Sequence, residues 1–242
     1  MSIKGVLLDV DGTLVDSNDA HAKAWVEAFK KFAYDISFEE VRPLIGMGGD
    51  KVISQLVPGL TDSEGVGKEI SSFRQQLIVN QYGKKLSPTP GARQLLLKML
   101  SLGLKLIVAS SAKNEELSVL LKSAGIEDLL PEATTSSDVD NSKPEPDIVQ
   151  AARDKINLPQ SQVIMLGDTP YDIEAASRAG VSIIALRCGG FSDSQLEGAV
   201  AIYDDPAQLL EQYETSETVC KENIKQSGAI FPELIVLTSN EP

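Results

Sequence analysis

The sequence predicts an α/β protein in which a mostly parallel sheet, covered by helices on both faces, carries an inserted all-α domain. Short apolar runs that end in polar or turn residues alternate with helical segments from residue 92 onward, which is typical of βαβ units. Residues 17–86 contain helical patterns and no convincing strand. We therefore expect a core domain made of residues 1–16 and 87–213, interrupted by a helical domain of residues 17–86.

The first predicted strand lies at the start of the chain. Residues 4–8 read Lys-Gly-Val-Leu-Leu and lead into Asp9-Val10-Asp11-Gly12-Thr13, so a buried apolar run ends in two carboxylates. Alternation along an extended chain would point Asp9 and Asp11 the same way. Two like charges so close are unfavourable unless a cation or a shared proton relieves them.

The inserted domain is predicted from its helical periodicity. Trp25, Phe29 and Phe32 recur at i, i+4 and i+7, which places them along one face of a helix. Ser17 or Asn18 is a suitable N-cap for that helix. Further helical patterns cover residues 38–45, 49–57 and 63–82.

The remaining core elements follow in alternation. We expect helices at residues 92–102, 114–123, 143–156 and 171–179, and strands at residues 104–109, 162–166 and 182–186, with weaker strands at 133–135 and 199–203 and a helix from Pro206. The pattern weakens after residue 213, and residues 214–242 are assigned to a tail.

Composition narrows the function classes. Lys and Arg number 22 against 35 Asp and Glu, which gives a net charge of −13 and argues against general binding of nucleic acid or anionic membranes. No run approaches the roughly 18 apolar residues that span a membrane. The chain enters its first strand at once, so we expect no targeting peptide. Cys188 and Cys220 have no metal-type spacing and are expected to be free thiols of a cytoplasmic protein; the oligomeric state is not readable.

Polar side chains follow three of the predicted strands. Because the carboxyl ends of parallel neighbours meet at one edge of a sheet, these side chains should gather in one crevice. Several carboxylates beside hydroxyls and a lysine fit a hard, oxygen-binding cation such as Mg²⁺ together with a phosphate group. The residues are Asp9 and Asp11, Ser110 and Ser111, Asp168 and Asp172, with Lys143 at the start of the helix predicted between the last two strands.

Phosphoryl transfer would use these groups in distinct roles. Asp9, the first acid after its strand, is the predicted nucleophile, and Asp11 is placed to protonate the leaving oxygen. Lys143 can neutralise charge on the phosphate and on the nucleophile.

The other strand-end residues have matching roles. Ser110, Ser111 and the backbone N–H groups that follow can hold phosphoryl oxygens at a helix N-terminus, while Asp168 can bind the metal with Asp172 as a direct or indirect partner. Taken singly, each residue has an ordinary reading as a helix cap, a turn residue or a surface charge. Their joint, ordered occurrence favours the phosphoryl-transfer reading.

The ordered motifs resemble those of the haloacid dehalogenase superfamily of phosphohydrolases over roughly residues 1–213. The resemblance implies Asp9 as nucleophile, Asp11 as general acid and base, and Mg²⁺ held by Asp9, the backbone carbonyl of Asp11, and Asp168. It also implies a Rossmann-like core and a helical cap of the type found in the first subfamily. The matching segments are Asp9-Val10-Asp11-Gly12-Thr13, then Ser110, then Lys143 before Pro144, and finally Gly167-Asp168 with Asp172.

The same resemblance points to the inserted domain for substrate contacts. His21, Lys23 and the loop of residues 46–51, including Gly48 and Lys51, become candidates, and the Gly-rich loop suits a lid as well as it suits a plain helix–helix turn. A mutase of the β-phosphoglucomutase type would be expected to carry an arginine where this loop reads Gly48-Gly49-Asp50.

We therefore expect a Mg²⁺-dependent phosphatase that acts on a small phosphorylated metabolite through an aspartyl-phosphate. Two alternatives remain at this point. One is a phosphomutase of the β-phosphoglucomutase type, and the other is a regulatory protein that binds metal without turnover. The presence of Asp11 beside Asp9 counts against the second, because a binding module needs no general acid.

Overall fold

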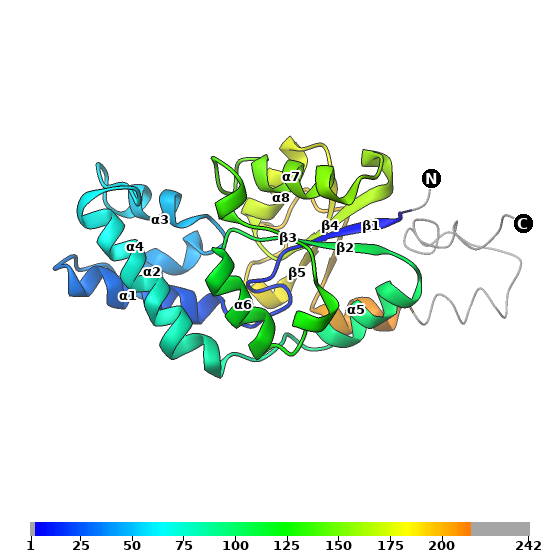
Figure 1. The fold of residues 1–242 in the computed structure, drawn as a ribbon, viewed down its shortest axis with the longest axis horizontal. Coiled ribbons are helices and arrows are strands. Elements are labelled where there is room, and N and C mark those ends of the chain that lie inside the picture. Colours follow the sequence, from blue (N-terminus) through cyan, green and yellow to red (C-terminus); the bar gives the residue numbers. More distant parts are fainter. Residues whose placement is uncertain (1–2, 214–242) are drawn as a thin grey trace, which may run out of the picture.

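The structure is a computed structural model that describes residues 3–213, and its centre is a six-stranded parallel sheet (Figure 1). The sheet order is β3-β2-β1-β4-β5-β6, and the predicted α/β class is confirmed. The strands are β1 (Gly5–Leu8), β2 (Lys105–Ala109), β3 (Ala133–Thr134), β4 (Val163–Gly167), β5 (Ser182–Leu186) and β6 (Ala201–Tyr203).

The first strand occupies the middle of the sheet. Leu7 pairs with Ile107 of β2 on one side and with Met165 of β4 on the other. Every residue of β1 is buried, as expected for a parallel strand with both faces covered. The polar residues that follow β1, β2 and β4 therefore emerge at the same edge.

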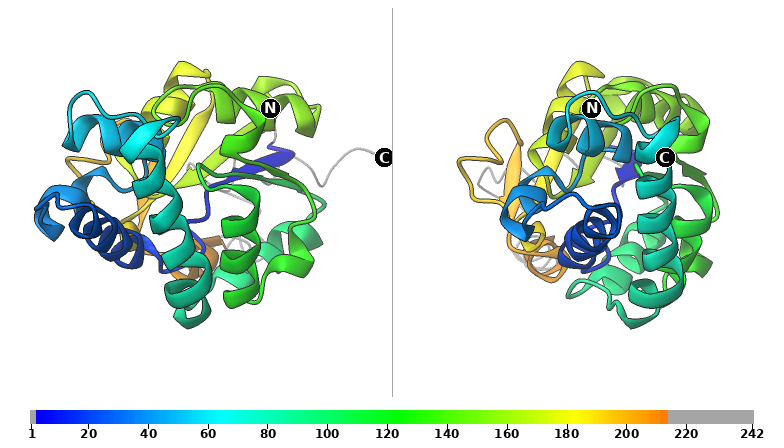
Figure 2. Two further views of the ribbon diagram at one scale, coloured as in Figure 1. Left: turned by 60° about the vertical axis from the view of Figure 1, so that its left-hand side comes forward. Right: turned by 90° about the vertical axis from the view of Figure 1, so that its left-hand side faces the viewer.

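Two helical layers cover the sheet (Figures 1 and 2). Leu8 of β1 packs in one hydrophobic cluster with α5 and α6, whereas Leu7 packs in a second cluster with α7 and α8. This division follows from the alternation of side chains along a strand. The helices are α5 (Ala92–Ser101), α6 (Asn114–Ser123), α7 (Asp147–Ile156) and α8 (Pro170–Arg178), and residues 206–213 are also helical.

The chain between β1 and β2 forms a helical unit beyond the carboxyl end of the sheet (Figure 2). Trp25, Phe29, Ile53 and Ile70 are buried in a cluster of its own, so the unit has a separate apolar core. We call residues 18–85 the helical unit. Its elements are α1 (Asn18–Lys31), α2 (Phe38–Val41), η1 (Arg42–Leu44), α3 (Gly49–Leu56), α4 (Gly65–Leu77), η2 (Ile78–Tyr82) and η3 (Gly83–Lys85).

The helix predicted to open at Lys143 is shorter than expected. It begins at Asp147, directly after Pro146. The residue before a proline avoids the α conformation, so Lys143 and Glu145, which precede Pro144 and Pro146, hold the segment in a turn. None of the helices in residues 3–213 is long and apolar enough to cross a membrane. The predicted tail and Cys220 lie outside the described residues.

Candidate active site

Four charged side chains from three loops meet at the carboxyl edge of the sheet. Asp9 follows β1, Asp168 follows β4, and Asp172 lies in the first turn of α8. A carboxylate oxygen from each lies within 4.8 Å of the other two, and all three residues are buried. Lys143 places its Nζ 2.5 Å from Asp9 Oδ1 and 2.8 Å from Asp172 Oδ1, so one ammonium group bridges two of the acids.

Two side-chain donors and two close glycines fix the position of the Asp168 carboxylate. Thr13 Oγ1 donates to its Oδ1 at 2.7 Å and Asn18 Nδ2 to its Oδ2 at 2.9 Å. A Cβ atom on Gly12 would lie 2.2 Å from Asp168 Oδ2, and one on Gly189 would lie 1.8 Å from it. Only glycine leaves room for the carboxylate at these two positions.

Asp172 joins the cluster through the cap of α8. Its Oδ2 accepts the backbone N–H of Thr169 at 3.0 Å and the Thr169 hydroxyl at 2.7 Å, and Thr169 Oγ1 accepts the backbone N–H of Asp172 in return. This reciprocal capping box leaves Oδ1 for Lys143. The helix start therefore fixes both ends of the carboxylate.

The cluster carries more negative charge than its single lysine offsets. Burial and the nearby charge of Asp172 raise the pKa of Asp9 to about 7, although Lys143 opposes the shift. Burial and the charge of Asp9 raise the pKa of Asp168 well above its ordinary value. Burial would lower the pKa of Lys143, but Asp172 and Asp9 outweigh it and raise that pKa. An oxygen-binding divalent cation would relieve the repulsion, so the donor set fits a metal.

The carboxylate of Asp11 belongs to a different network. It accepts from Ser17 Oγ at 2.5 Å and from His21 Nε2 at 2.6 Å. Arg74 Nη2 lies 2.9 Å from His21 Nδ1, and because arginine only donates, Nδ1 accepts and Nε2 carries the proton. Arg74 is held in turn by Glu116 of α6, whose Oε2 is 2.8 Å from Nη1.

This network sets the charge state of Asp11. Burial would raise the pKa of Asp11, but the His21 contact and the Ser17 hydrogen bond outweigh burial and leave the pKa below its usual value. The Asp11 side chain is therefore turned toward α1 and is not one of the three clustered acids. His21, predicted as a substrate contact, has both ring nitrogens engaged in the network.

The two serines after β2 face differently. Ser110 is buried, and its hydroxyl accepts the backbone N–H of Ala112 at 3.1 Å within its own turn. Ser111 lines the cavity, and its buried Oγ has no hydrogen-bond partner among residues 3–213. The α6 helix begins at Asn114, with Lys113 as its N-cap. Ser111 is therefore the serine that lines the cavity, whereas Ser110, whose hydroxyl keeps its own O–H to donate, is not part of the lining.

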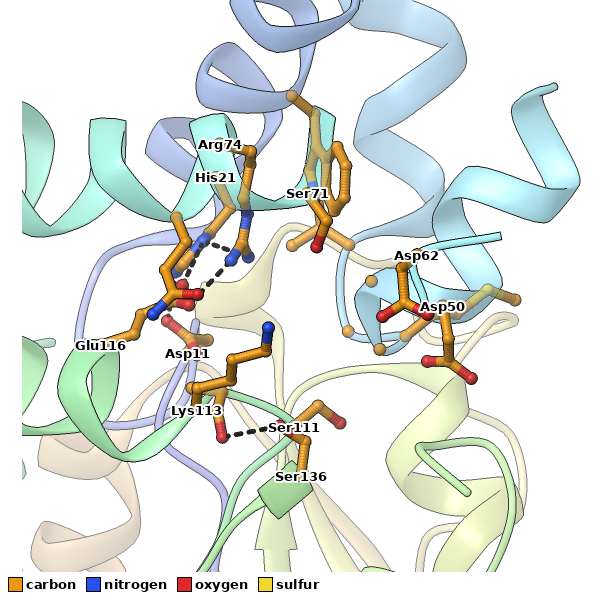
Figure 3. Close-up of a pocket in the computed structure, with 18 of the residues that line it drawn as sticks. Asp11, His21, Asp50, Asp62, Ser71, Arg74, Ser111, Lys113, Glu116 and Ser136 are labelled. Carbon is orange, nitrogen blue, oxygen red and sulfur yellow. Dashed lines mark hydrogen bonds and ion pairs between the residues drawn. The ribbon is translucent and has the colours of Figure 1, made fainter. Parts of the chain in front are cut away.

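A cavity between the sheet edge and the helical unit opens onto these groups (Figure 3). Gly48, from the predicted loop, lines the cavity, whereas Lys51 does not and pairs with Asp50 at 3.7 Å. Lys23 is exposed on α1 and does not line the cavity. Asp50, from the same predicted loop, also lines the cavity, whereas sequence reasoning missed the lining residues Asp62, Ser71, Arg74, Gln75, Lys113 and Glu116. All but Asp62, which lies in a loop, belong to or cap helices, and no local motif marks any of them.

The chain is similar to known proteins in sequence and in structure. The family model described as haloacid dehalogenase-like hydrolase matches residues 6–186. Phosphoglycolate phosphatase of Vibrio cholerae is 29% identical over 218 residues, which cover 87% of this chain and 96% of that protein.

One further relative matches this chain over a small part of its own length, and one solved structure matches it over nearly its whole length. The chloroplastic protein SUPPRESSOR OF QUENCHING 1 of Arabidopsis thaliana is 30% identical over 189 residues, which are 76% of this chain but 18% of that protein; the chain thus spans less than a fifth of that relative. A crystal structure of a hydrolase from Pseudomonas syringae superposes with a TM-score of 0.81 at 28% identity and covers 88% of this chain and 98% of the other.

Proposed function

Because the chain belongs to the haloacid dehalogenase-like hydrolases, we propose that it is a Mg²⁺-dependent phosphatase that hydrolyses a small phosphorylated metabolite through an aspartyl-phosphate. The observation that carries this proposal is the gathering of Asp9, Asp168 and Asp172 around Lys143 at the end of β1 and β4. Buried carboxylates that repel one another lower the stability of the fold. Such clusters are typical of sites that bind a cation and a charged substrate group.

Asp9 and Asp11 divide the chemistry. An Asp9 oxygen attacks phosphorus and the bond from phosphorus to the leaving oxygen breaks. The protonated form of Asp11, which is the minor form because the pKa of Asp11 is lowered, supplies the proton to that oxygen. Water then attacks the aspartyl-phosphate, Asp11 takes a proton from that water, and the bond between phosphorus and the Asp9 oxygen breaks. His21, Ser17 and Arg74 position Asp11 for both proton transfers.

Charge on the phosphoryl group needs compensation from several donors. Asp9, Asp168 and the Asp11 carbonyl would hold Mg²⁺, with Asp172 as their neighbour. The bound ion would withdraw charge from the phosphoryl oxygens. Lys143 adds a fixed positive charge beside Asp9, and the unpartnered Ser111 hydroxyl offers a hydrogen bond to a phosphoryl oxygen.

We further propose that the helical unit is a cap over this site, with its boundaries near residues 17 and 86. Two of its contacts with the sheet domain lie beside the cavity. Ser142, which precedes Lys143, donates to Asp50, and the N–H of Gly48 lies 3.4 Å from the Lys143 carbonyl oxygen. A cap docked in this way excludes water from the phosphoryl group and shapes the leaving-group pocket.

A phosphate-release screen tests the activity. We expect release of inorganic phosphate from at least one member of a panel of sugar phosphates, phosphoglycolate, nucleotides and pyrophosphate with Mg²⁺, and its loss in EDTA, because the acidic cluster needs the cation. A phosphomutase would isomerise a sugar phosphate and release little phosphate. No reaction with any member of the panel would contradict the proposal and favour a binding protein.

Thermal stability should depend on Mg²⁺ in a pH-dependent way. Asp9 has a folded-state pKa of about 7 and an unfolded one near 4, so the metal-free protein binds the extra proton between these values and loses stability as the pH rises through 7. Mg²⁺ replaces the proton. In melting curves, Mg²⁺ should raise the Tm by about 5 °C or more at pH 8 and have little effect at pH 5.

Asp168→Asn is the control for that measurement, because it removes a cluster carboxylate without touching the surface of the protein. It should abolish the Mg²⁺ shift at pH 8. An equal Mg²⁺ shift at pH 5 and pH 8 would count against the metal assignment.

A further inference from the structure

The far side of the cavity, away from Asp9, is built by the helical unit and is rich in acceptors. Asp50 lies at the start of α3, Asp62 in the loop that precedes α4, and Ser71 and Gln75 on α4. In Figure 3 the side chains of Asp50, Asp62 and Ser71 face the same space. A substrate whose phosphoryl group sits at Asp9 would place its leaving group here.

Two carboxylates dominate this side electrostatically. Asp62 is half-buried, and burial together with the nearby charge of Asp50 raises its pKa, while Lys113 opposes the shift. Ser142 donates to one oxygen of Asp50, and that hydrogen bond leaves the negative charge in place. The two acids therefore repel any further anion that enters between them.

The cations around the cavity do not offset both acids. Arg74 is held by Glu116 and by the acceptor nitrogen of His21. Lys113 caps α6 two residues after Ser111, and its ammonium points into the cavity (Figure 3), close enough to Asp62 to oppose the rise of that pKa. Lys51 stands outside the lining and pairs with Asp50 at 3.7 Å on a partly exposed surface. A second anion on the leaving group would meet two carboxylates and a single unpaired lining cation of the described residues, Lys113, which already offsets part of the charge of Asp62.

Ser71 indicates what the pocket binds instead. Its side chain points into the cavity (Figure 3), and the residue is only 9% exposed. Its hydroxyl forms no hydrogen bond with any other residue of the described range 3–213. A hydroxyl that opens onto the cavity in this way can both donate to and accept from a ligand hydroxyl. Trp25 also lines the cavity beside Gly49 and adds an apolar contact there.

We propose that Asp50 and Asp62 select substrates whose leaving group is an uncharged polyol and reject those whose leaving group carries a carboxylate or a second phosphate. This inference rests on the proposed phosphatase function and names the substrate class of the same site. The polyol hydroxyls donate to the two carboxylates and exchange a hydrogen bond with Ser71. By this reading phosphoglycolate, the substrate in the name of the Vibrio cholerae relative, is a poor substrate for this chain.

A pair of three-carbon esters provides the test. Glycerol 3-phosphate and 3-phosphoglycerate share their phosphate position and differ by a hydroxymethyl group against a carboxylate. We expect kcat/KM for the first to exceed that for the second by at least about tenfold, and Asp62→Asn to raise kcat/KM for 3-phosphoglycerate by about three- to tenfold through the loss of one like charge. Ser71→Ala should lower kcat/KM only for glycerol 3-phosphate.

Glu64→Gln is the matched control, since it removes a negative charge from an exposed residue of the same loop that does not line the cavity. It should leave the ratio of the two esters unchanged. A wild-type preference for 3-phosphoglycerate, or an unchanged ratio in Asp62→Asn, would overturn the proposal. If neither ester turned over, the phosphatase function would itself be in question for these esters, and calorimetric titration of the wild-type protein with each ester would decide the charge preference; equal affinities, or none, would overturn it.

Discussion

Asp9→Asn is expected to reduce phosphate release by at least about a thousandfold, because the amide cannot form the acyl-phosphate on which both steps depend. The fold should survive. The raised pKa of Asp9, about 7, means that its folded surroundings disfavour the charged form despite Lys143. A neutral side chain of the same shape therefore costs little at pH 8 in the metal-free protein.

The measurement combines steady-state phosphate release with denaturant unfolding of the same samples. Asp16→Asn is the matched control, because it makes the same Asp-to-Asn change in the same segment at an exposed residue. The Asp16→Asn protein should retain wild-type activity. Retention of more than about a tenth of the activity in Asp9→Asn would assign the nucleophile elsewhere. If Asp9→Asn loses activity because it unfolds, the nucleophile would be identified instead by trapping the phosphorylated residue of the wild-type protein.

Lys143→Met should produce the largest combined loss, because it removes the only ammonium group found inside the acidic cluster of the described residues. The methionine fills similar space but leaves Asp9, Asp168 and Asp172 facing one another. Breaking a buried ion pair in this way costs about 3–5 kcal/mol of unfolding free energy. Activity should fall by about a hundredfold or more, since the phosphoryl charge loses a fixed partner.

The pH dependence of this loss has a definite sign. The folded-state pKa of Lys143 is raised, so its contribution is present below the unfolded-state pKa near 10.4 and disappears only as the pH rises through the folded-state value. At pH 8 the full loss is expected, and at pH 5 protonation of Asp9 should reduce it. The check is the urea unfolding free energy of both proteins in EDTA at the two pH values.

Lys122→Met is the control for that comparison. Its ion pair with Glu127 is exposed, with a separation of 3.5 Å, and such pairs contribute at most about 1 kcal/mol. If the Lys143→Met protein were as stable as the Lys122→Met protein, Lys143 would not be offsetting repulsion among the three buried acids, and this prediction would be wrong.

Much of the site was predictable because it depends on strand ends. The apolar runs before Asp9 and Asp168 have the length and composition of buried parallel strands, and the topology of such sheets brings their carboxyl ends to one edge. The prediction that Asp9, Lys143, Asp168 and Asp172 meet there agrees with the contacts found. The roles assigned to these residues stay proposals until the variants are measured.

Local detail was less predictable. The turn after β2 could present either serine, and only the backbone path decides that Ser110 bonds to Ala112 while Ser111 faces the cavity. The helix expected at Lys143 begins at Asp147, because two prolines delay it. Each outcome depends on a few backbone dihedral angles, which residue type alone restricts only loosely.

The sequence by itself determined the sheet, the order of its acidic strand ends and the helical insertion, since periodicity and strand-end chemistry are properties of neighbouring residues. Only the tertiary structure decided that Arg74 and Glu116 hold His21 against Asp11, and that Asp62 and Ser71 face the phosphoryl site. These residues lie on separate helices and loops with ordinary local patterns. Their meeting depends on how the helical unit packs against the sheet, which no short stretch of sequence encodes.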